Sequence, residues 1–424
     1  MMSCAGNKWL KTPAMDSLAA KGTRFTRAYC TNPVCTPSRF SLMTGKMPSY
    51  MGVYANSDTP DTSKEKLDEI KKMGIGHILG AAGYDAVYGG KTHLPGFSPE
   101  DIGFNILTRD SRGTLAEACA DYIRNHDRAK PLYMCASFIN PHDICLMAIE
   151  DAYGCMDGKD GRNVTPSMME YSRGLKEIMD TWSKEKFNEC PPLPFNHEKQ
   201  NDEPEAISLL MEQRPFKKYV RENWGEKEWR LHRWAFCRLC EKVDSHIAVI
   251  LKAIEDAGMM EDSLIIFSTD HGEMDSAHRM EHKECLYEEA CRVPLIIKPP
   301  ASSPRRAAET DRLVSNGLDM LPTILDYADI STHANYYRGR SLRPLVEGFE
   351  IKQRDYLPIE CENGLAIVSE KYKYTVYNKG ESREQFYDLD KDPGEMHNFL
   401  KAPDKQGSLE ELRLYYQKEF NPPH

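Results

Sequence analysis

Short apolar runs alternate with amphipathic stretches over most of this chain. A run of about four to eight apolar residues between turn residues is typical of a strand that is buried on both faces. The stretches between the runs place apolar residues three and four positions apart, as helices do. The pattern predicts strands over residues 23–30, 84–88, 132–138 and 264–268, and helices over residues 12–22, 115–123 and 243–257.

This alternation predicts an α/β fold with a large, mostly parallel central sheet flanked by helices. In such sheets, binding sites collect at the carboxyl ends of the strands. Lys91, His142 and Asp270 each follow a predicted strand. We therefore expect these three side chains, which are far apart in the sequence, to meet at one edge of the sheet.

The pattern changes after about residue 345. Alternating runs predict antiparallel strands over residues 356–360, 365–369, 372–377 and 385–389, followed by a helix over residues 409–420. We expect a catalytic domain over residues 1–345 and a smaller C-terminal subdomain of antiparallel strands plus a helix over residues 346–424. Residues 145–229 are largely polar, and we interpret them as an excursion near the site.

Composition narrows the class of protein. The chain has 424 residues, 40% of them hydrophobic and 28% charged, which suits a globular protein with a large core. Its net charge of -10 argues against nucleic acid as a partner, so an anionic substrate needs a local cationic pocket. The 13 cysteines show no disulfide framework, and no apolar run is long enough to span a membrane. The compartment is left open, because any export signal would precede Met1.

Cys35 begins the run Cys-Thr-Pro-Ser-Arg at residues 35–39, which the sequence places at the start of a helix. Pro37 suits a first helical turn, and Gly45 supplies a left-handed stop. A thiol at a helix N-terminus has a lowered pKa, and Arg39 adds a cation one turn further on. These features favour an oxyanion site, although a buried structural cysteine would also fit this segment taken alone.

The run at residues 35–39, with Thr44-Gly45 after it, resembles the signature of type I sulfatases of the alkaline phosphatase superfamily. In that family an enzyme oxidises the cysteine to formylglycine, whose hydrate is the nucleophile. Further segments match the family in the same order: Gly-Lys-Thr-His at residues 90–93, Asn-Pro-His-Asp at 140–143, Asp-His-Gly-Glu at 270–273, Lys283 ahead of Leu-Tyr-Glu-Glu at 286–289, and Tyr-Asp-Leu at 387–389.

The resemblance implies hydrolysis of a sulfate ester, on a small molecule or a saccharide. Cys35, as the formylglycine hydrate, would attack sulfur. His93 would then accept the proton from the second hydroxyl group and expel sulfate. The cationic and donor groups expected to hold sulfate or the leaving oxygen are Arg39, Lys91, His142 and Lys283. The implied partners are the sulfate ester and a formylglycine-generating or anaerobic maturation enzyme.

The resemblance also implies a divalent metal held by Asp270 and His271, together with the formylglycine made from Cys35. Family members commonly have Asn where this chain has His271. We expect Ca²⁺, with Mn²⁺ or Mg²⁺ as alternatives. The imidazole of His271 adds a nitrogen donor, which favours Mn²⁺ as an alternative to Ca²⁺.

The N-terminus departs from the family pattern. Relatives have a strand that ends in paired Asp residues ahead of the positions matching Gly6-Asn7 and the Thr-Pro helix start at residues 12–13. We expect Met1 to be an internal Met of a longer protein. Loss of that strand would leave backbone groups unpaired in the sheet and would weaken metal binding.

Two other functions stay open from the sequence. A phosphonate or phosphate ester hydrolase of the same superfamily would use the same nucleophile and an Asp-His metal pair. A catalytically degenerate protein that binds sulfated ligands would keep the cationic groups without maturation of Cys35.

Overall fold

The computed structural model describes residues 2–60, 63–153, 177, 181, 183–304, 308–331 and 337–420. Its strands are β1 Thr23–Tyr29, β2 Asp85–Gly90, β3 Asn105–Thr108, β4 Leu132–Ser137, β5 Ile265–Ser268, β6 Arg292–Lys298, β7 Ala308–Thr310, β8 Val314–Ser315, β9 Leu357–Cys361, β10 Gly364–Val368, β11 Tyr372–Tyr377 and β12 Glu384–Asp388. Among the described helices, none combines the length and apolar character needed to cross a membrane.

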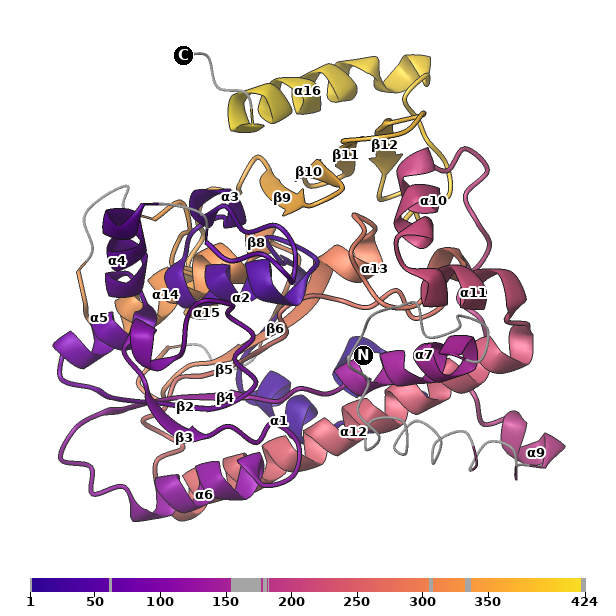
Figure 1. The fold of residues 1–424 in the computed structure, drawn as a ribbon. Helices are drawn as coiled ribbons and strands as arrows, with labels where there is room; N and C mark the ends of the chain where they lie inside the picture. Colours follow the sequence, from indigo (N-terminus) through magenta and orange to yellow (C-terminus); the bar gives the residue numbers. More distant parts are fainter. Residues whose placement is uncertain are drawn as a thin grey trace.

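Helices surround these strands (Figure 1). They are α1 Pro13–Lys21, α2 Cys35–Thr44, α3 Pro48–Met51, α4 Lys64–Lys72, α5 Ile75–Ala81, α6 Leu115–Asn125, α7 Cys145–Tyr153, α9 Lys184–Phe187, α10 Glu205–Glu212, α11 Pro215–Asn223, α12 Glu226–Asp256, α13 Glu288–Cys291, α14 Asn316–Tyr327, α15 Arg343–Val346 and α16 Gln406–Phe420.

The α/β part contains two sheets. One is parallel throughout, with strand order β3-β2-β4. The other has the order β5-β6-β1-β7, with β8 also pairing with β1. In this second sheet β6 runs antiparallel to both β1 and β5, so the sheet is mixed. The four strands predicted at residues 23–30, 84–88, 132–138 and 264–268 correspond to β1, β2, β4 and β5, which confirms the α/β fold class.

β4 and β5 are both edge strands, and every residue in them is only partly buried. By contrast, residues 86–90 of β2 are buried. Apolar residues of α1 and α12 pack near the two edges, where Met15 and Val243 join Phe138 and Phe267 in one core cluster. The sheet edges therefore lie inside the molecule rather than on its outer surface.

The C-terminal strands form a separate antiparallel sheet with the order β12-β11-β10-β9, and α16 packs on it through Leu409 and Leu412 (Figure 1). This confirms the predicted strands and final helix. Lys373 of β11 is fully buried and lies 2.8 Å from Glu395 and 3.2 Å from Glu288 of α13. The ion pairs connect this sheet to the segment that carries the site.

The predicted excursion is described only in part. Residues 154–176, 178–180 and 182 lie outside the described residues. The ends of the excursion contribute to a core cluster that includes Ala148 of α7, Phe216 of α11 and Trp229 of α12. The described ends are thus packed into the protein, although the segment as a whole is polar.

Candidate active site

Cys35 is the first residue of α2 and is 1% exposed. The preceding residue, Val34, is extended, and the Ser38 N–H donates to its carbonyl oxygen over 3.1 Å, which closes the first turn. The Thr36 N–H donates to Oδ1 of Asn56 over 3.1 Å. One of the N–H groups at the start of the helix therefore has a protein partner, which the sequence did not indicate.

Three basic side chains surround the sulfur atom of Cys35. Nε2 of His271 lies 3.1 Å away, Nζ of Lys283 3.2 Å away and Nζ of Lys91 3.4 Å away. Burial raises the pKa of the Cys35 thiol, but the charges of Lys283, His271 and Lys91 outweigh burial and hold that pKa well below its usual value. The structure thus brings Lys91 and Lys283, which are far from Cys35 in the sequence, to its sulfur atom.

Asp270 follows β5 and pairs with Arg39 of α2. Nε of Arg39 lies 2.8 Å from Oδ2 of Asp270, and its Nη1 donates to the Lys91 carbonyl oxygen over 3.0 Å and to Oγ of Ser137 over 2.8 Å. Burial raises the pKa of Asp270, yet Arg39 and the other nearby cations hold it well below its usual range. The guanidinium thus holds an ionised carboxylate close to Cys35.

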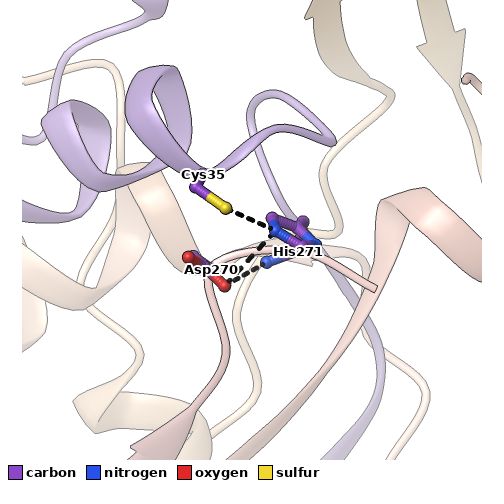
Figure 2. Close-up of side chains that lie close together, drawn as sticks. All are labelled: Cys35, Asp270 and His271. Atoms are coloured by element: carbon purple, nitrogen blue, oxygen red, sulfur yellow. Dashed lines mark hydrogen bonds and ion pairs between the residues drawn. The ribbon is translucent and has the colours of Figure 1, made fainter. Parts of the chain in front are cut away.

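A hydrogen bond from His271 determines which of its ring nitrogens can bind a metal. Nδ1 lies 2.7 Å from the carbonyl oxygen of Gly272. Because a carbonyl only accepts, Nδ1 carries the hydrogen atom, so Nε2 is the ring nitrogen that can bind a metal. Nε2 points toward the sulfur atom of Cys35 (Figure 2). The ring is therefore oriented to act as a ligand.

Cys35, Asp270 and His271 could hold a metal ion, since one ligand atom from each lies within 4.8 Å of the others (Figure 2). The set offers a sulfur, an ionised carboxylate and an imidazole lone pair held in place by a backbone carbonyl. Histidines that bind metals usually donate a hydrogen bond from their other ring nitrogen in this way. The residues present therefore fit the expected divalent metal, although they do not determine which metal it is.

His142 lies on a 3-10 turn after β4 and lines the same cavity as Lys91 and His271. Burial lowers the pKa of His142 to about 4, so the ring is neutral near pH 7. Its Nδ1 atom is 3.7 Å from Asp143, which Arg112 holds through two bonds of 2.9 and 2.7 Å. This arrangement places a neutral hydrogen-bonding group at the cavity.

In the described part of the chain, no hydrogen bond links His93 to Cys35. Its backbone is left-handed, with φ of 48°, and its buried Nδ1 has no hydrogen-bond partner among the described residues. Among the other predicted site residues, Lys91, His271 and Lys283 contact the Cys35 sulfur, Arg39 pairs with Asp270, and His142 lines the same cavity. The proton-accepting role of His93 stays a prediction.

Sequence reasoning missed the residues that hold Lys283 in place. Nζ of Lys217, on α11, donates to the Lys283 carbonyl oxygen over 3.0 Å and to Oε2 of Glu284 over 2.7 Å. Arg214 also pairs with Glu284 at 3.3 Å. Lys217 is only 1% exposed. Neither basic residue matches a motif, and no local signal distinguishes them from the many surface charges of this polar segment.

The assembled groups suit a tetrahedral anion. Two ammonium groups approach one point from different segments, while Arg39 and Asp270 neutralise each other. An uncharged group at position 35 would leave Lys91 and Lys283 without a negative charge beside them. An anionic ester would then supply that charge, as oxyanion sites commonly require.

Comparisons with known proteins agree with this chemistry. A family profile described as Sulfatase matches residues 1–330, and one described as N-sulphoglucosamine sulphohydrolase, C-terminal, matches residues 276–419. Delta 4,5-hexuronate-2-O-sulfatase of Bacteroides thetaiotaomicron is 29% identical over 427 residues, which cover 95% of this chain and 82% of that protein. Ulvan-active sulfatase of Formosa agariphila is 27% identical over 437 residues, which cover 98% of this chain and 77% of that protein.

A solved structure of a 2-O GAG sulfatase matches with a TM-score of 0.76 and 25% identity over 96% of this chain and 86% of that one. The likeness thus extends over both sheets of the α/β part and the C-terminal sheet. Because the Sulfatase profile covers most of the sequence, this chain belongs to the sulfatase family of enzymes.

Proposed function

We propose that the protein hydrolyses a sulfate ester on a saccharide, with a formylglycine made from Cys35 as the nucleophile. The observation that carries the proposal is the convergence on the Cys35 sulfur of His271, Lys283 and Lys91, all within 3.4 Å. A buried structural cysteine would not need two ammonium groups beside it. Membership of the sulfatase family supports sulfate ester hydrolysis as the type of reaction.

Two groups would complete the site. Formylglycine at position 35 would supply a hydrated aldehyde as nucleophile, and a divalent metal held by Asp270 and His271 would supply positive charge beside the sulfate group. The chemistry of the donors is compatible with Ca²⁺, Mn²⁺ or Mg²⁺.

The residues of the chain have separate tasks. Lys91 and Lys283 bind sulfate oxygens and stabilise charge on the leaving oxygen as the sulfur–oxygen ester bond breaks. Arg39 keeps Asp270 ionised and correctly placed. His142, neutral near pH 7, donates a hydrogen bond to the ester or sulfate oxygen.

Release of sulfate needs a proton acceptor near position 35, and we assign this role to His93. The assignment rests on its place in the Gly-Lys-Thr-His segment, two residues after Lys91. Movement of the His93 ring toward position 35 would be required for this step. The products are the free hydroxyl of the substrate and inorganic sulfate.

A sulfated saccharide is the proposed substrate class because relatives and structural neighbours are named for such substrates. They include the hexuronate 2-O-sulfatase, the ulvan-active sulfatase and the 2-O GAG sulfatase. Maturation of Cys35 implies a formylglycine-generating or anaerobic maturation enzyme as a partner.

Turnover of matched aryl sulfate and aryl phosphonate esters tests the reaction. The proposal predicts a higher kcat/KM for the sulfate, and a preference for the phosphonate would overturn it in favour of a phosphonate hydrolase. Mass spectrometry of the peptide containing Cys35 tests maturation, since conversion of the thiol to formylglycine removes about 18 Da. A persistent free thiol after natural expression would indicate a binding protein instead.

A further inference from the structure

A second cavity lies where the α/β part meets the C-terminal sheet. It has a volume of about 240 Å³ and is lined by Leu318 of α14, Arg338 and Arg340 of the loop that follows, residues 354–358 that lead into β9, and Lys418 of α16. We call it the arginine pocket. None of its lining residues lines the cavity at the candidate active site. Any ligand of the arginine pocket is therefore bound apart from the nucleophile.

Positive charge gathers in the arginine pocket. Four cations line it, Arg338, Arg340, Arg354 and Lys418, and among the described residues of the lining the one acid is Asp355. The chain as a whole has a net charge of -10, so this excess of positive charge is local. Grouped like charges repel one another unless an anion neutralises them. The lining therefore suits an anionic ligand.

Arg354 is held in place by Asp319, a buried residue of α14 that does not line the pocket. Nη1 and Nη2 of Arg354 each donate to the Asp319 carboxylate over 2.8 Å. The same carboxylate accepts the N–H groups of Ser315 and Arg340, also over 2.8 Å. Arg354 thus uses two of its five donor hydrogens, and no described residue accepts the other three. A guanidinium fixed in this way is well suited to bind an oxyanion.

Arg338 and Arg340 are exposed, and the loop between them lies directly against α14. A Cβ atom at Gly339 would lie 1.8 Å from the carbonyl oxygen of Leu318, so only glycine allows this approach. The close approach fixes the backbone of both arginines beside the pocket. Their position is therefore set by the fold and not by the side chains alone.

Two of the four cations have no acidic partner. Arg338 pairs with Glu419 of α16, whose second carboxylate oxygen accepts the Tyr356 hydroxyl over 3.2 Å. Arg340 and Lys418 form no ion pair with any residue that the structure describes, and both are exposed. An anion in the pocket would supply the missing partner for both.

The remaining lining distinguishes a sugar from a bare anion. Leu318, Tyr356, Leu357 and Pro358 offer apolar and aromatic surface, and the carboxylate of Asp355 adds a hydrogen-bond acceptor. An inorganic anion would use only the cations and would be repelled by Asp355. A sugar has C–H faces for the apolar wall and hydroxyl groups that can donate to the carboxylate. The complete lining therefore fits a sugar that carries a charged group.

We propose that the arginine pocket binds one sulfated sugar residue of a saccharide chain, with the sulfate group on Arg340, Arg354 and Lys418 and the ring on the apolar wall. The volume of about 240 Å³ is below the range of about 300–1,000 Å³ that is usual for pockets enclosing drug-sized ligands, so it fits one residue rather than an oligosaccharide. The inference rests on the proposed function in taking a sulfated saccharide as the substrate class.

β9 connects the arginine pocket to the segment before Cys35. Pro358 lines the pocket, and two residues later the Glu360 N–H donates to the Thr31 carbonyl oxygen over 2.8 Å. Thr31 is four residues before Cys35. Because an extended chain advances at most about 3.6 Å per residue, the Cα atoms of Pro358 and Cys35 lie within about 30 Å. A saccharide chain that occupied both sites would present its ester groups to the nucleophile at a raised effective concentration.

Protection of Lys418 from acetylation tests the proposal on the full chain. Acetic anhydride modifies exposed lysines, and mass spectrometry measures the extent at each one. Glucose 6-sulfate, the probe, should slow acetylation of Lys418 in a saturable way and leave Lys401, an exposed lysine outside the pocket, unchanged. Glucose should give no protection, and inorganic sulfate should need a concentration about tenfold higher or more because it lacks the ring. Sodium chloride at matched ionic strength corrects for general screening.

A matched pair of variants identifies the partner of the sulfate group. Arg340→Gln removes a cation that has no acidic partner and should raise the concentration of glucose 6-sulfate needed to protect Lys418 by about tenfold or more. Arg109→Gln makes the same substitution at an exposed arginine outside the pocket and should leave that concentration unchanged. Their melting temperatures check that both variants are folded.

The proposal is overturned if glucose 6-sulfate does not protect Lys418, or if Arg340→Gln and Arg109→Gln respond alike. Equal protection by inorganic sulfate would show a site for inorganic anions only and would also overturn it. Turnover of a small aryl sulfate by the matured wild type tests the proposed function separately, and Arg340→Gln should not change that kcat/KM. Absence of turnover would remove the proposed sulfatase reaction, whereas absence of protection would remove the arginine pocket alone.

Discussion

The Nζ atom of Lys283 lies 3.2 Å from the Sγ atom of Cys35, although the residues are 248 positions apart in the sequence. This contact places a positive charge where the reacting ester would develop negative charge. Lys283→Ala should therefore lower kcat/KM on an aryl sulfate by about a hundredfold or more, as the loss of an oxyanion donor does in other enzymes. Lys283→Arg should retain part of the activity. Unchanged kcat/KM in Lys283→Ala would remove Lys283 from the mechanism.

Glu284 should stabilise the fold in a pH-dependent way. Burial raises the pKa of Glu284, but Lys217 and Arg214 lower it to about 2. Because the folded-state pKa is below the usual carboxyl value of about 4.3, the stabilisation is present at neutral pH and is lost as the pH falls from about 4.3 toward 2. Glu284→Gln should thus cost about 3–5 kcal/mol of unfolding free energy at pH 7, because Lys217 stays buried without its partner.

Urea unfolding of the wild type and Glu284→Gln at pH 7 and at pH 3.5 measures this difference, which should narrow at the lower pH. Adding Lys217→Met to Glu284→Gln should recover most of the loss at pH 7. A difference between wild type and Glu284→Gln that grows on acidification would contradict the sign derived for Glu284.

His271 should influence which metal binds. Its Nε2 lone pair offers nitrogen, whereas an Asn side chain offers oxygen, and nitrogen donors favour Mn²⁺ over Ca²⁺. His271→Asn should lower the affinity for Mn²⁺ by about tenfold while changing the affinity for Ca²⁺ less. Isothermal titration calorimetry with each ion measures the two affinities. His77→Asn, at an exposed histidine, is the matched control, and an equal effect of both variants would argue against His271 as a ligand.

Lys373 should be important for stability because it is buried between two carboxylates. Lys373→Met leaves Glu288 and Glu395 without their shared cation and should cost about 3–5 kcal/mol of unfolding free energy. Lys371→Met makes the same substitution at an exposed lysine two residues earlier and should change stability by less than about 0.5 kcal/mol. Denaturant unfolding of both variants tests this, and similar losses in the two would show that the buried ion pairs contribute little.

Apolar runs and motif residues were enough to predict much of the fold and site. Residues 23–30, 84–88, 132–138 and 264–268 form strands because their side chains are apolar and bounded by turn residues. Lys91 and Asp270 meet because both follow strands whose carboxyl ends share one region of the molecule. These features depend on the local pattern of residues, so they could be predicted from the sequence.

Other features depend on contacts that no local pattern records. Lys217 reaches Lys283 from a helix 66 positions earlier, and the sequence gives no reason to select it among the other lysines. The direction of β6 relative to β1 is set by pairing and packing, so the second sheet is mixed rather than parallel. A backbone carbonyl likewise determines which nitrogen of His271 can bind a metal, and the residue type alone does not predict this.

The central claim is that Cys35 becomes the nucleophile of a sulfatase. The most direct measurement is multiple turnover of an aryl sulfate by Cys35→Ala, compared with the wild type expressed together with a maturation enzyme. We predict that the wild type turns over many times and that Cys35→Ala, folded to the same melting temperature, shows no turnover above background. Retained multiple turnover in Cys35→Ala would contradict the assignment.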